Sequence, residues 1–269
     1  MVERSRRGKG KHKRQTKLLG SHQRCWLWGR VLVGETLRAG RWNILELFLA
    51  DDLPPDQKRF ATRRAAELSV AVTIESRNAL TRRCRSGEHQ GYVARMSPFP
   101  YASLDEILSA RSASSLFVLL DSIQDPYNFG AILRSAEVFG ADAVFVGERH
   151  QAEVSSMVAR SSAGAINRVP IVQVPSLVSL AESLKSLSMT VVGTSEHAKL
   201  TSWDVPLSPP IAIIIGNEGA GIGPELLAPC DRVIRIPHQG DIGSLNAAAA
   251  AAVLLHEVRR QQAESDGAT

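Results

Sequence analysis

Between residues 116 and 236 the chain alternates short, continuously apolar runs with stretches of helical spacing. A strand buried on both faces needs an unbroken apolar run, and a parallel arrangement places a helix between successive strands. The pattern therefore predicts an α/β fold with a parallel sheet covered by helices. The runs that we expect to form strands are 116–120, 143–146, 171–174, 190–192, 211–215 and 233–236. A helix over 244–260 follows, with six consecutive alanines at 247–252.

A second, smaller α/β domain is predicted ahead of this sheet. Its expected strands lie at 45–49, 70–74 and 91–95, and an amphipathic helix covers 56–68. A segment rich in Pro, Ser and Ala then separates the two domains and holds a helical turn at 104–108. The predicted organisation is a disordered basic tail at 1–20, a small α/β domain at 21–97, a linker at 98–115, a larger domain at 116–262 and a C-terminal tail at 263–269.

Charge is divided unevenly along the chain. Residues 1–100 contain 21 Lys and Arg against 9 Asp and Glu, whereas residues 101–269 contain 11 against 18. Clustered cations neutralise phosphates well, so the basic half is predicted to bind nucleic acid. A solvated basic surface is the alternative. A mitochondrial targeting peptide is the less favoured interpretation of residues 1–20, which are rich in Lys and Gly and lack an amphipathic period.

Cysteine spacing and hydropathy indicate a cytoplasmic protein. Cys25, Cys84 and Cys230 are far apart and form no Cys/His pattern, so we expect neither a disulfide framework nor a metal site. No apolar run approaches the about 20 residues that a membrane span needs. The first residues lack the apolar core of a secretory signal. We therefore expect a soluble chain with no membrane partner.

Three segments rich in polar residues and glycine follow predicted strands, at 121–130, 216–222 and 236–246. Ligands of parallel α/β sheets bind at the carboxyl ends of the strands, so these segments predict a ligand site. The second segment matches neither a dinucleotide fingerprint nor a phosphate-binding loop. The helix expected at 131–139 stops at Gly140. Purely structural roles remain as alternatives: Ser244 and Asn128 could cap helices, and Arg134 could lie on a solvated face.

At these segments the sequence resembles the SpoU/TrmH family of RNA 2′-O-ribose methyltransferases, within the SPOUT superfamily. The matching stretches are DSIQDPYNFGAILRSAEVFGADAVFV, SSAGAI, IAIIIGNEGAGI and IRIPHQGDIGSLNAAAAAAVLLHE, in the family's order and spacing. More loosely, WGRVLVGETLRAG and EHQGYVARM resemble the RNA substrate-binding domain of the ribosomal RNA guanosine branch. The resemblance implies a C-terminal trefoil knot, S-adenosyl-L-methionine as the methyl donor, and a homodimer paired through the knotted domain, partly by the alanine-rich helix.

The resemblance also assigns roles to individual residues. Arg134 is implied to act on the ribose 2′-hydroxyl. The residues implied to orient it, the donor or the ribose are Asn128, Glu218, Ser244 and Asn246. The residues implied to contact the donor are Gly216, Ile236, Leu245, Thr194, Asn217 and Gly219. An arginine is a poor base because its delocalised guanidinium keeps its proton, so we expect Arg134 to act together with a neighbouring RNA phosphate.

The expected reaction is methylation of a guanosine in large-subunit ribosomal RNA. A transfer-RNA ribose methyltransferase of the same family is one alternative, and the long N-terminal domain argues against it. A non-catalytic RNA-binding or ribosome-assembly protein with this fold is another, and the joint presence of the five catalytic candidates argues against that. Gly243 and His238 depart from residues common in the family, which leaves loop geometry and substrate preference open.

Overall fold

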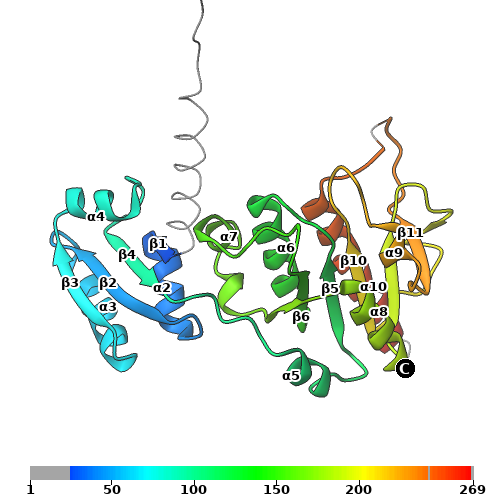
Figure 1. Ribbon diagram of the computed structural model, residues 1–269, viewed down its shortest axis with the longest axis horizontal. Helices are drawn as coiled ribbons and strands as arrows, with labels where there is room; N and C mark the ends of the chain where they lie inside the picture. Colours follow the sequence, from blue (N-terminus) through cyan, green and yellow to red (C-terminus); the bar gives the residue numbers. More distant parts are fainter. Residues whose placement is uncertain (1–24, 242, 268–269) are drawn as a thin grey trace, which may run out of the picture. The chain divides into compact units, whose positions relative to one another are not determined.

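The computed structural model describes residues 25–241 and 243–267, so the predicted tail at 1–20 lies outside the described residues (Figure 1). The chain divides into two compact units. The first comprises Met1–Pro100 together with Val154–Arg160, and the second comprises Tyr101–Glu153 and Ser161–Thr269. A short segment of the C-terminal half, 154–160, therefore groups with the N-terminal unit.

The first unit contains a mixed four-stranded sheet of order β1-β4-β2-β3, in which only the β2–β3 pair is parallel. Its helices α2 and α3 pack together, and α4 contacts β1, β2 and β4. The expected strands and the helix α3 are confirmed. The elements are β1 (Trp26–Trp28), α2 (Arg30–Ala39), β2 (Ile44–Ala50), α3 (Pro55–Glu67), β3 (Ala71–Glu75), α4 (Arg77–Cys84), β4 (Tyr92–Met96) and α7 (Ser156–Ser161).

The second unit is built on a seven-stranded sheet of order β7-β6-β5-β10-β8-β11-β9, and every neighbouring pair is parallel. This confirms the predicted parallel sheet and adds the two-residue strand β9. Its elements are α5 (Leu104–Ser109), β5 (Leu116–Leu120), α6 (Pro126–Val138), β6 (Ala143–Gly147), η1 (Ala165–Asn167), β7 (Ile171–Val174), α8 (Leu177–Ser186), β8 (Thr190–Thr194), β9 (Leu200–Thr201), β10 (Ile211–Ile215), α9 (Pro224–Leu227), β11 (Arg232–Arg235) and α10 (Ala247–Gly267).

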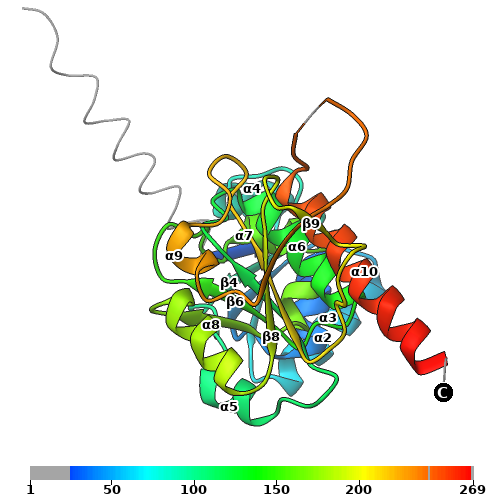
Figure 2. The same cartoon turned by 90° about the vertical axis from the view of Figure 1, so that its right-hand side faces the viewer.

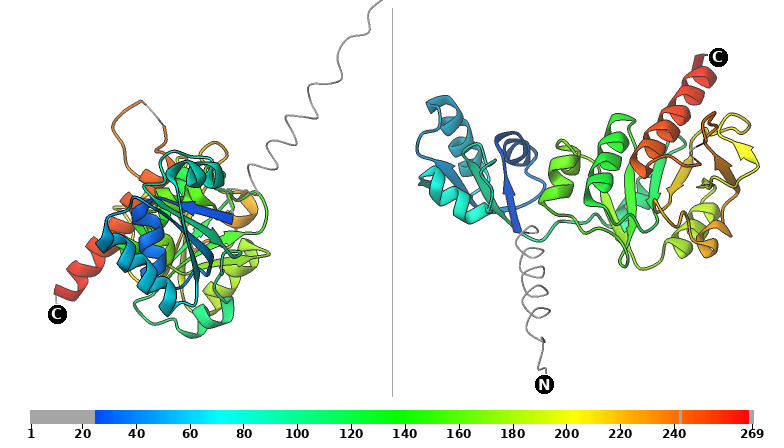
Figure 3. Two further views of the ribbon diagram at one scale, coloured as in Figure 1. Left: turned by 90° about the vertical axis from the view of Figure 1, so that its left-hand side faces the viewer. Right: turned by 90° about the horizontal axis from the view of Figure 1, so that it is seen from above.

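Helices cover both faces of the sheet in the second unit, as Figure 2 shows, with α5, α8 and α9 on one side and α6 and α10 on the other. Strands β5 and β10 are buried along their whole length, which explains their unbroken apolar runs. Helices α6 and α10 lie side by side (Figure 3). Near their far ends, Arg259 on α10 donates hydrogen bonds of 2.6 Å to the carbonyl oxygens of Phe139 and Gly140.

The start of helix α6 differs from the sequence prediction. Helix α6 begins at Pro126 and is capped by Asp125, whose Oδ1 accepts a 2.9 Å hydrogen bond from the backbone N–H of Tyr127. Asn128 therefore lies inside the first turn, and its interpretation as a cap was wrong. The helix does end just before Gly140, whose φ of +64° few other residues adopt easily.

The last helix starts later and ends later than expected. Asn246 caps it, because its Oδ1 accepts hydrogen bonds from the N–H groups of Ala248 at 2.9 Å and Ala249 at 3.3 Å. The alternative that Ser244 is the cap is therefore wrong. Helix α10 continues beyond Arg260 to Gly267 because no Gly or Pro interrupts it and Arg260 pairs with Glu257 and Glu264 one turn away on either side. Among the helices that the structure describes, none has the length and apolarity to cross a bilayer.

Candidate active site

The strand order brings four chain segments to one edge of the sheet. Strands β5, β10, β8 and β11 are consecutive neighbours and run parallel, so their carboxyl ends lie side by side. The three segments predicted to form a ligand site follow β5, β10 and β11. A fourth, beginning at Ser195, follows β8. Loops that are far apart in the sequence therefore meet at this edge.

Hydrogen bonds lock the first loop to the second. Asp121, directly after β5, accepts a 2.8 Å hydrogen bond at Oδ2 from the backbone N–H of Gly223. Asn217 donates from Nδ2 to the carbonyl oxygen of Ser122 at 2.8 Å. Ser122 has a φ of +60°, a strained conformation for a residue with a side chain. The sequence prediction includes Asp121 and Ser122 in the first segment but assigns neither residue a role, although their position directly after a buried strand was a usable signal.

The second loop is a compact turn closed on itself. The backbones of Asn217 and Gly221 exchange two hydrogen bonds of 2.9 and 3.0 Å, and Oδ1 of Asn217 accepts from the N–H groups of Gly219 and Ala220. A Cβ on Gly216 would lie 2.6 Å from the nitrogen of Ile222, so only glycine fits there. Asn217 was expected to touch a donor molecule; its side chain is engaged in holding the loop.

Three of the predicted catalytic residues are linked by hydrogen bonds between their side chains. Asn246 donates from Nδ2 to Oδ1 of Asn128 at 2.9 Å, and Asn128 donates from its own Nδ2 to a carboxylate oxygen of Glu218. This link joins the start of α10, the first turn of α6 and the second loop. Because Asn246 also caps α10, its amide group is oriented at both ends.

The structure does not join the other two predicted catalytic residues to this link. Arg134 is exposed on α6, six residues after Asn128 and therefore on a different face of the helix. Ser244 is exposed in the third loop. Within the described ranges, neither side chain has a hydrogen bond or an ion pair. Both groups are therefore available to a bound molecule.

The remaining candidates surround the same edge. Thr194 ends β8, and its hydroxyl donates to the carbonyl oxygen of Ile214 at 3.0 Å, which ties β8 to β10. Ile236 opens the third loop and is partly exposed, and Leu245 closes the loop with 47% of its surface exposed. Apolar side chains beside a glycine turn suit a flat, apolar ligand group held partly by backbone atoms.

The thiol beneath this edge is unsuited to nucleophilic chemistry. Burial, followed by the charge of Asp231, raises the pKa of Cys230 to about 11. Its Sγ donates to the carbonyl oxygen of Leu226 at 3.3 Å and lies where a side chain on Gly193 of β8 would be. Cys230 therefore stays protonated and packs as an apolar group.

Comparison with known families assigns both parts of the chain. Residues 115–256 match the model of the SpoU rRNA Methylase family. Residues 26–102 match a family model described as RNA 2′-O ribose methyltransferase substrate binding. The first match contains all the catalytic and donor-contact candidates, and the second covers the described strands of the N-terminal unit.

Whole-chain relatives agree with these models. YacO of Bacillus subtilis (strain 168), named as a TrmH family tRNA/rRNA methyltransferase, is 31% identical over 245 residues, which is 90% of this chain and 98% of the relative. A protein of Mycobacterium avium (strain 104), named as a tRNA/rRNA methyltransferase, is 34% identical and covers 87% of this chain and 76% of the relative.

Solved structures share the fold. The SpoU methyltransferase AviRb from Streptomyces viridochromogenes, crystallised with its cofactor AdoMet, superposes with a TM-score of 0.77 at 26% identity, covering 95% of this chain and 99% of that one. A crystal structure of an RNA 2′-O ribose methyltransferase gives 0.73 at 26% identity, covering 95% and 97%. With family models, full-length relatives and solved folds in agreement, the chain belongs to the SpoU/TrmH family of RNA methyltransferases.

Proposed function

We propose that the protein transfers the methyl group of S-adenosylmethionine to a ribose 2′-hydroxyl of RNA. The observation that carries the proposal is the link from Asn246 through Asn128 to Glu218 at the carboxyl edge of the sheet. Family membership supplies the reaction class, and the related AviRb was crystallised with this donor. The trefoil knot that the family resemblance implies stays a prediction.

The residues at the edge fit S-adenosylmethionine. The donor has a flat adenine, and Leu245 and Ile236 offer partly exposed apolar surface for it. At Gly216 the turn has no side chain that would keep a ligand away from the backbone. Beside this turn lies the Glu218 carboxylate, whose negative charge suits a positively charged donor.

The acceptor hydroxyl is the demanding part of the reaction. Bound donor supplies a methyl group on a positively charged sulfur, ready for attack by oxygen. The ribose hydroxyl loses its proton to a neighbouring RNA phosphate as the new O–CH₃ bond forms and the S–CH₃ bond breaks, so that the neutral thioether S-adenosylhomocysteine leaves. Arg134 stabilises the negative charge that develops on the oxygen, because a guanidinium donates hydrogen bonds but does not act as a base. Ser244 is free to orient the ribose, and the asparagine link fixes the loops around it.

We further propose that a second copy completes the site. Arg134 lies on the outward face of α6, away from the asparagine link, so its guanidinium is placed to act in the active site of a partner chain. Apolar side chains on the outward faces of the same helix pair are well exposed: Val138 at 65% and Val253 at 41%. Their exposure suits a homodimer paired through α6 and α10.

Sedimentation and mixing experiments test the homodimer. Substituting Glu for both Val138 and Val253 should yield a monomer, whereas Leu200→Glu, at an exposed apolar position elsewhere, should remain a dimer. If Arg134 acts across the interface, inactive Arg134→Ala and Asn246→Ala chains should regain part of the activity when they are mixed. A monomeric wild-type protein would refute the dimer.

For the RNA we propose a guanosine of large-subunit ribosomal RNA. The substrate-binding model over 26–102 and the basic charge of the first hundred residues support an extended RNA contact by the N-terminal unit. Mapping of 2′-O-methyl groups in RNA from cells with and without the gene tests this target. Loss of one guanosine methyl in ribosomal RNA is expected, whereas a loss confined to transfer RNA would contradict it.

Donor binding tests the reaction itself. Isothermal titration of the full chain with S-adenosylmethionine should show saturable binding, because the turn at Gly216 is packed by contacts within the chain and the apolar edge is partly exposed beside it. Absence of binding by the folded protein would overturn the proposed function.

A further inference from the structure

Trp203 follows strand β9 and is the most exposed of the large apolar side chains in the described residues, at 72%. An indole side chain on a mobile loop would lower its free energy by folding inward, away from water. The neighbours of Trp203 are not free to move in that way: Ser202 is 2% exposed and Val205 is 5% exposed. The chain is therefore buried on both sides of Trp203, while the indole ring itself points outward.

The turn that carries Trp203 is closed by local hydrogen bonds. Asp204 accepts at Oδ2 from both the N–H and the hydroxyl of Thr201, at 2.8 and 2.7 Å. The N–H of Trp203 donates to the Thr201 hydroxyl at 3.3 Å. The Thr201 hydrogen bonds, with a smaller contribution from the charge of Arg235, hold the pKa of Asp204 below its ordinary value. The carboxylate stays ionised near neutral pH and keeps the turn closed.

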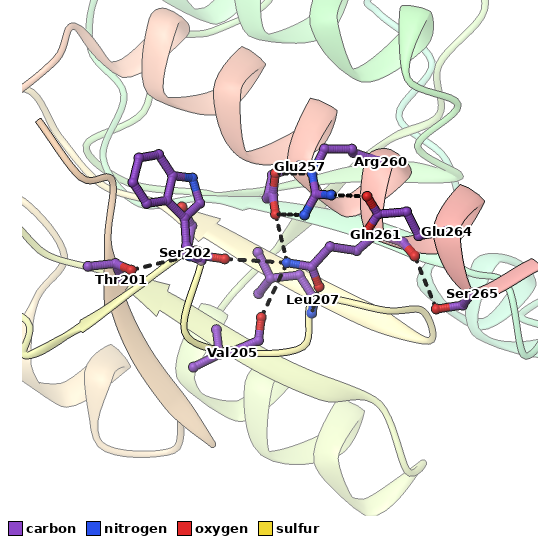
Figure 4. Close-up of polar contacts among 10 residues, drawn as sticks. Thr201, Ser202, Val205, Leu207, Glu257, Arg260, Gln261, Glu264 and Ser265 are labelled. Atoms are coloured by element: carbon purple, nitrogen blue, oxygen red, sulfur yellow. Dashed lines mark hydrogen bonds and ion pairs between the residues drawn. The ribbon is translucent and has the colours of Figure 1, made fainter. Parts of the chain in front are cut away.

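Gln261 on helix α10 holds the same turn by hydrogen bonds, as Figure 4 shows. Gln261 donates from Nε2 to the carbonyl oxygens of Ser202 and Val205, both at 3.3 Å, and accepts at Oε1 from the N–H of Leu207 at 2.7 Å. Glu257, which is 7% exposed, accepts from Gln261 at 2.7 Å and so orients its amide. The indole is therefore displayed on a rigid support.

The turn lies at the same edge of the sheet as the candidate active site. In the β9–β11 pair, Thr201 is opposite Arg235, and the N–H of Ser202 donates to the carbonyl oxygen of Arg235 at 2.9 Å. The residue after Arg235 is Ile236, which opens the third loop. Trp203 is thus next to the end of the strand from which that loop departs.

From this arrangement we propose that Trp203 is a stacking platform for an unpaired base of the RNA substrate, beside the nucleotide that is methylated. The inference rests on the proposed function. A rigid aromatic ring loses little entropy when a base stacks on it, and unpaired RNA bases are recognised in this way. The cationic side chains of Lys199 and Arg235 flank the turn and suit the adjoining phosphates.

RNA fits this surface better than a second protein chain does. A stable protein interface needs a contiguous apolar core, whereas here one ring stands beside charged groups, with Leu200 at 44% exposure as its apolar neighbour. One base, in contrast, covers one ring. The role assigned to Trp203 is positioning of the substrate, and it includes no proton transfer.

Fluorescence titration of the full chain tests the platform directly. The probe is a ten-nucleotide single-stranded RNA, with the fully paired duplex of the same sequence as the control. Stacking should quench the emission of Trp203, seen as the difference between wild type and Trp203→Phe. Trp203→Ala should weaken binding of the single strand by about tenfold, and Trp203→Phe should weaken it much less because it keeps a flat ring. The slope of binding against salt should be unchanged, since the indole carries no charge.

Two further variants sharpen the experiment. Leu200→Ala, on the same segment but without a ring, should bind RNA as the wild type does. Gln261→Ala should weaken RNA binding in part, because the ring remains but its support is loosened. Equal affinity of wild type and Trp203→Ala for the single strand would overturn the platform, as would a change in sedimentation caused by Trp203→Ala, which would assign the ring to a contact between copies. Titration of the wild type with S-adenosylmethionine is the separate readout for the proposed function. If the wild type does not bind the donor, the proposed function is overturned as well.

Discussion

Arg134 is the residue on which the proposed chemistry depends most directly. Its guanidinium is exposed and has no partner among the residues that the structure describes, so it is available to stabilise charge on a bound ribose. Arg134→Ala should lower turnover by about 100-fold or more, the usual scale for losing a group that stabilises developing negative charge. Affinity for S-adenosylmethionine should stay close to that of the wild type, because the donor contacts lie on the loops.

Single-turnover methylation and donor titration of the same preparation check this prediction. Arg134→Lys is the matched variant: it keeps the charge but loses the fork of donors, and it should recover only part of the activity. Turnover of Arg134→Ala within a few-fold of wild type would refute the role.

A second prediction concerns the effect of substituting Gly216 on donor binding. A methyl group at this position would lie 2.6 Å from the nitrogen of Ile222, against backbone that cannot move away cheaply. Gly216→Ala should therefore open the second loop and weaken donor binding by about tenfold or more. Isothermal titration measures the effect. Gly147→Ala, where an added Cβ would make an ordinary 3.6 Å contact, is the control. Unchanged donor affinity in Gly216→Ala would show that the turn does not shape the site.

Among the elements, α6 and α10 depend on each other through their first turns. The family resemblance implies that Asn128 and Asn246 both orient Arg134, the donor or the ribose. The structure shows one hydrogen bond between them, with Asn246 also capping α10. Sequence spacing placed both residues near helix starts, but it could not reveal the pairing, because that depends on α6 and α10 packing side by side across 118 residues of chain.

Strongly patterned elements were predicted and weakly patterned ones were missed. Strands β5 and β10 are apolar throughout, so the sequence alone located them. Helix α2 was missed because Gly34 interrupts its interior, and glycine disfavours helix. Strands β1 and β9 are only three and two residues long, too short for any period to be visible. The turn with Trp203 was missed because its order comes from Gln261, far away in the sequence.

His89, in the connection between α4 and β4, predicts that the free energy of unfolding of the first unit depends on pH. His89 is buried; its Nδ1 accepts from the N–H of Gly91 at 3.0 Å and its Nε2 faces the hydroxyl of Thr81 at 3.1 Å. Nδ1 therefore carries no proton, and burial, followed by the charge of Arg77, lowers the pKa of His89. The unfolded chain then binds a proton more readily than the folded one, so the free energy of unfolding of the first unit should fall as the pH drops below about 6.5.

Urea unfolding of Trp203→Phe protein at about pH 7.5 and about pH 5.5 measures this effect, because the remaining tryptophans, Trp26, Trp28 and Trp42, all belong to the first unit. The first unit should be less stable at the lower pH, and adding His89→Gln should reduce the difference. Greater stability at the lower pH would contradict the assignment, since carboxylates titrate mostly below this range.

For the whole molecule, the uneven charge along the chain predicts how RNA binding responds to salt. Residues 1–20 contain eight Lys and Arg. If these side chains neutralise phosphates, deleting residues 1–20 should make the plot of log affinity against log salt shallower by about 0.7 to 0.9 for each phosphate that the tail had neutralised. Filter binding to ribosomal RNA at several salt concentrations measures the slope, with donor affinity as the unaffected control. An unchanged slope would mean that the basic tail does not bind RNA.

The division of the molecule into a basic N-terminal part and a parallel-sheet part was visible in the sequence. What the sequence pattern did not contain is the strand order, which places β10 and β8 between β5 and β11 and so assembles the site from distant loops. The family resemblance supplied the identity of the site residues, because their types alone fitted helix caps and solvated faces equally well. Nor did the sequence reveal that 154–160 groups with the N-terminal unit, since no local pattern marks it.

The proposed reaction is methylation of a ribose 2′-hydroxyl of RNA. The most direct test is mass spectrometry of nucleosides from deproteinised large-subunit ribosomal RNA that has been incubated with the purified full chain and S-adenosylmethionine. We expect 2′-O-methylguanosine to accumulate with the wild type and not with Arg134→Ala. A methyl group found only on a base, or no methylated nucleoside with a protein that binds both RNA and donor, would contradict it.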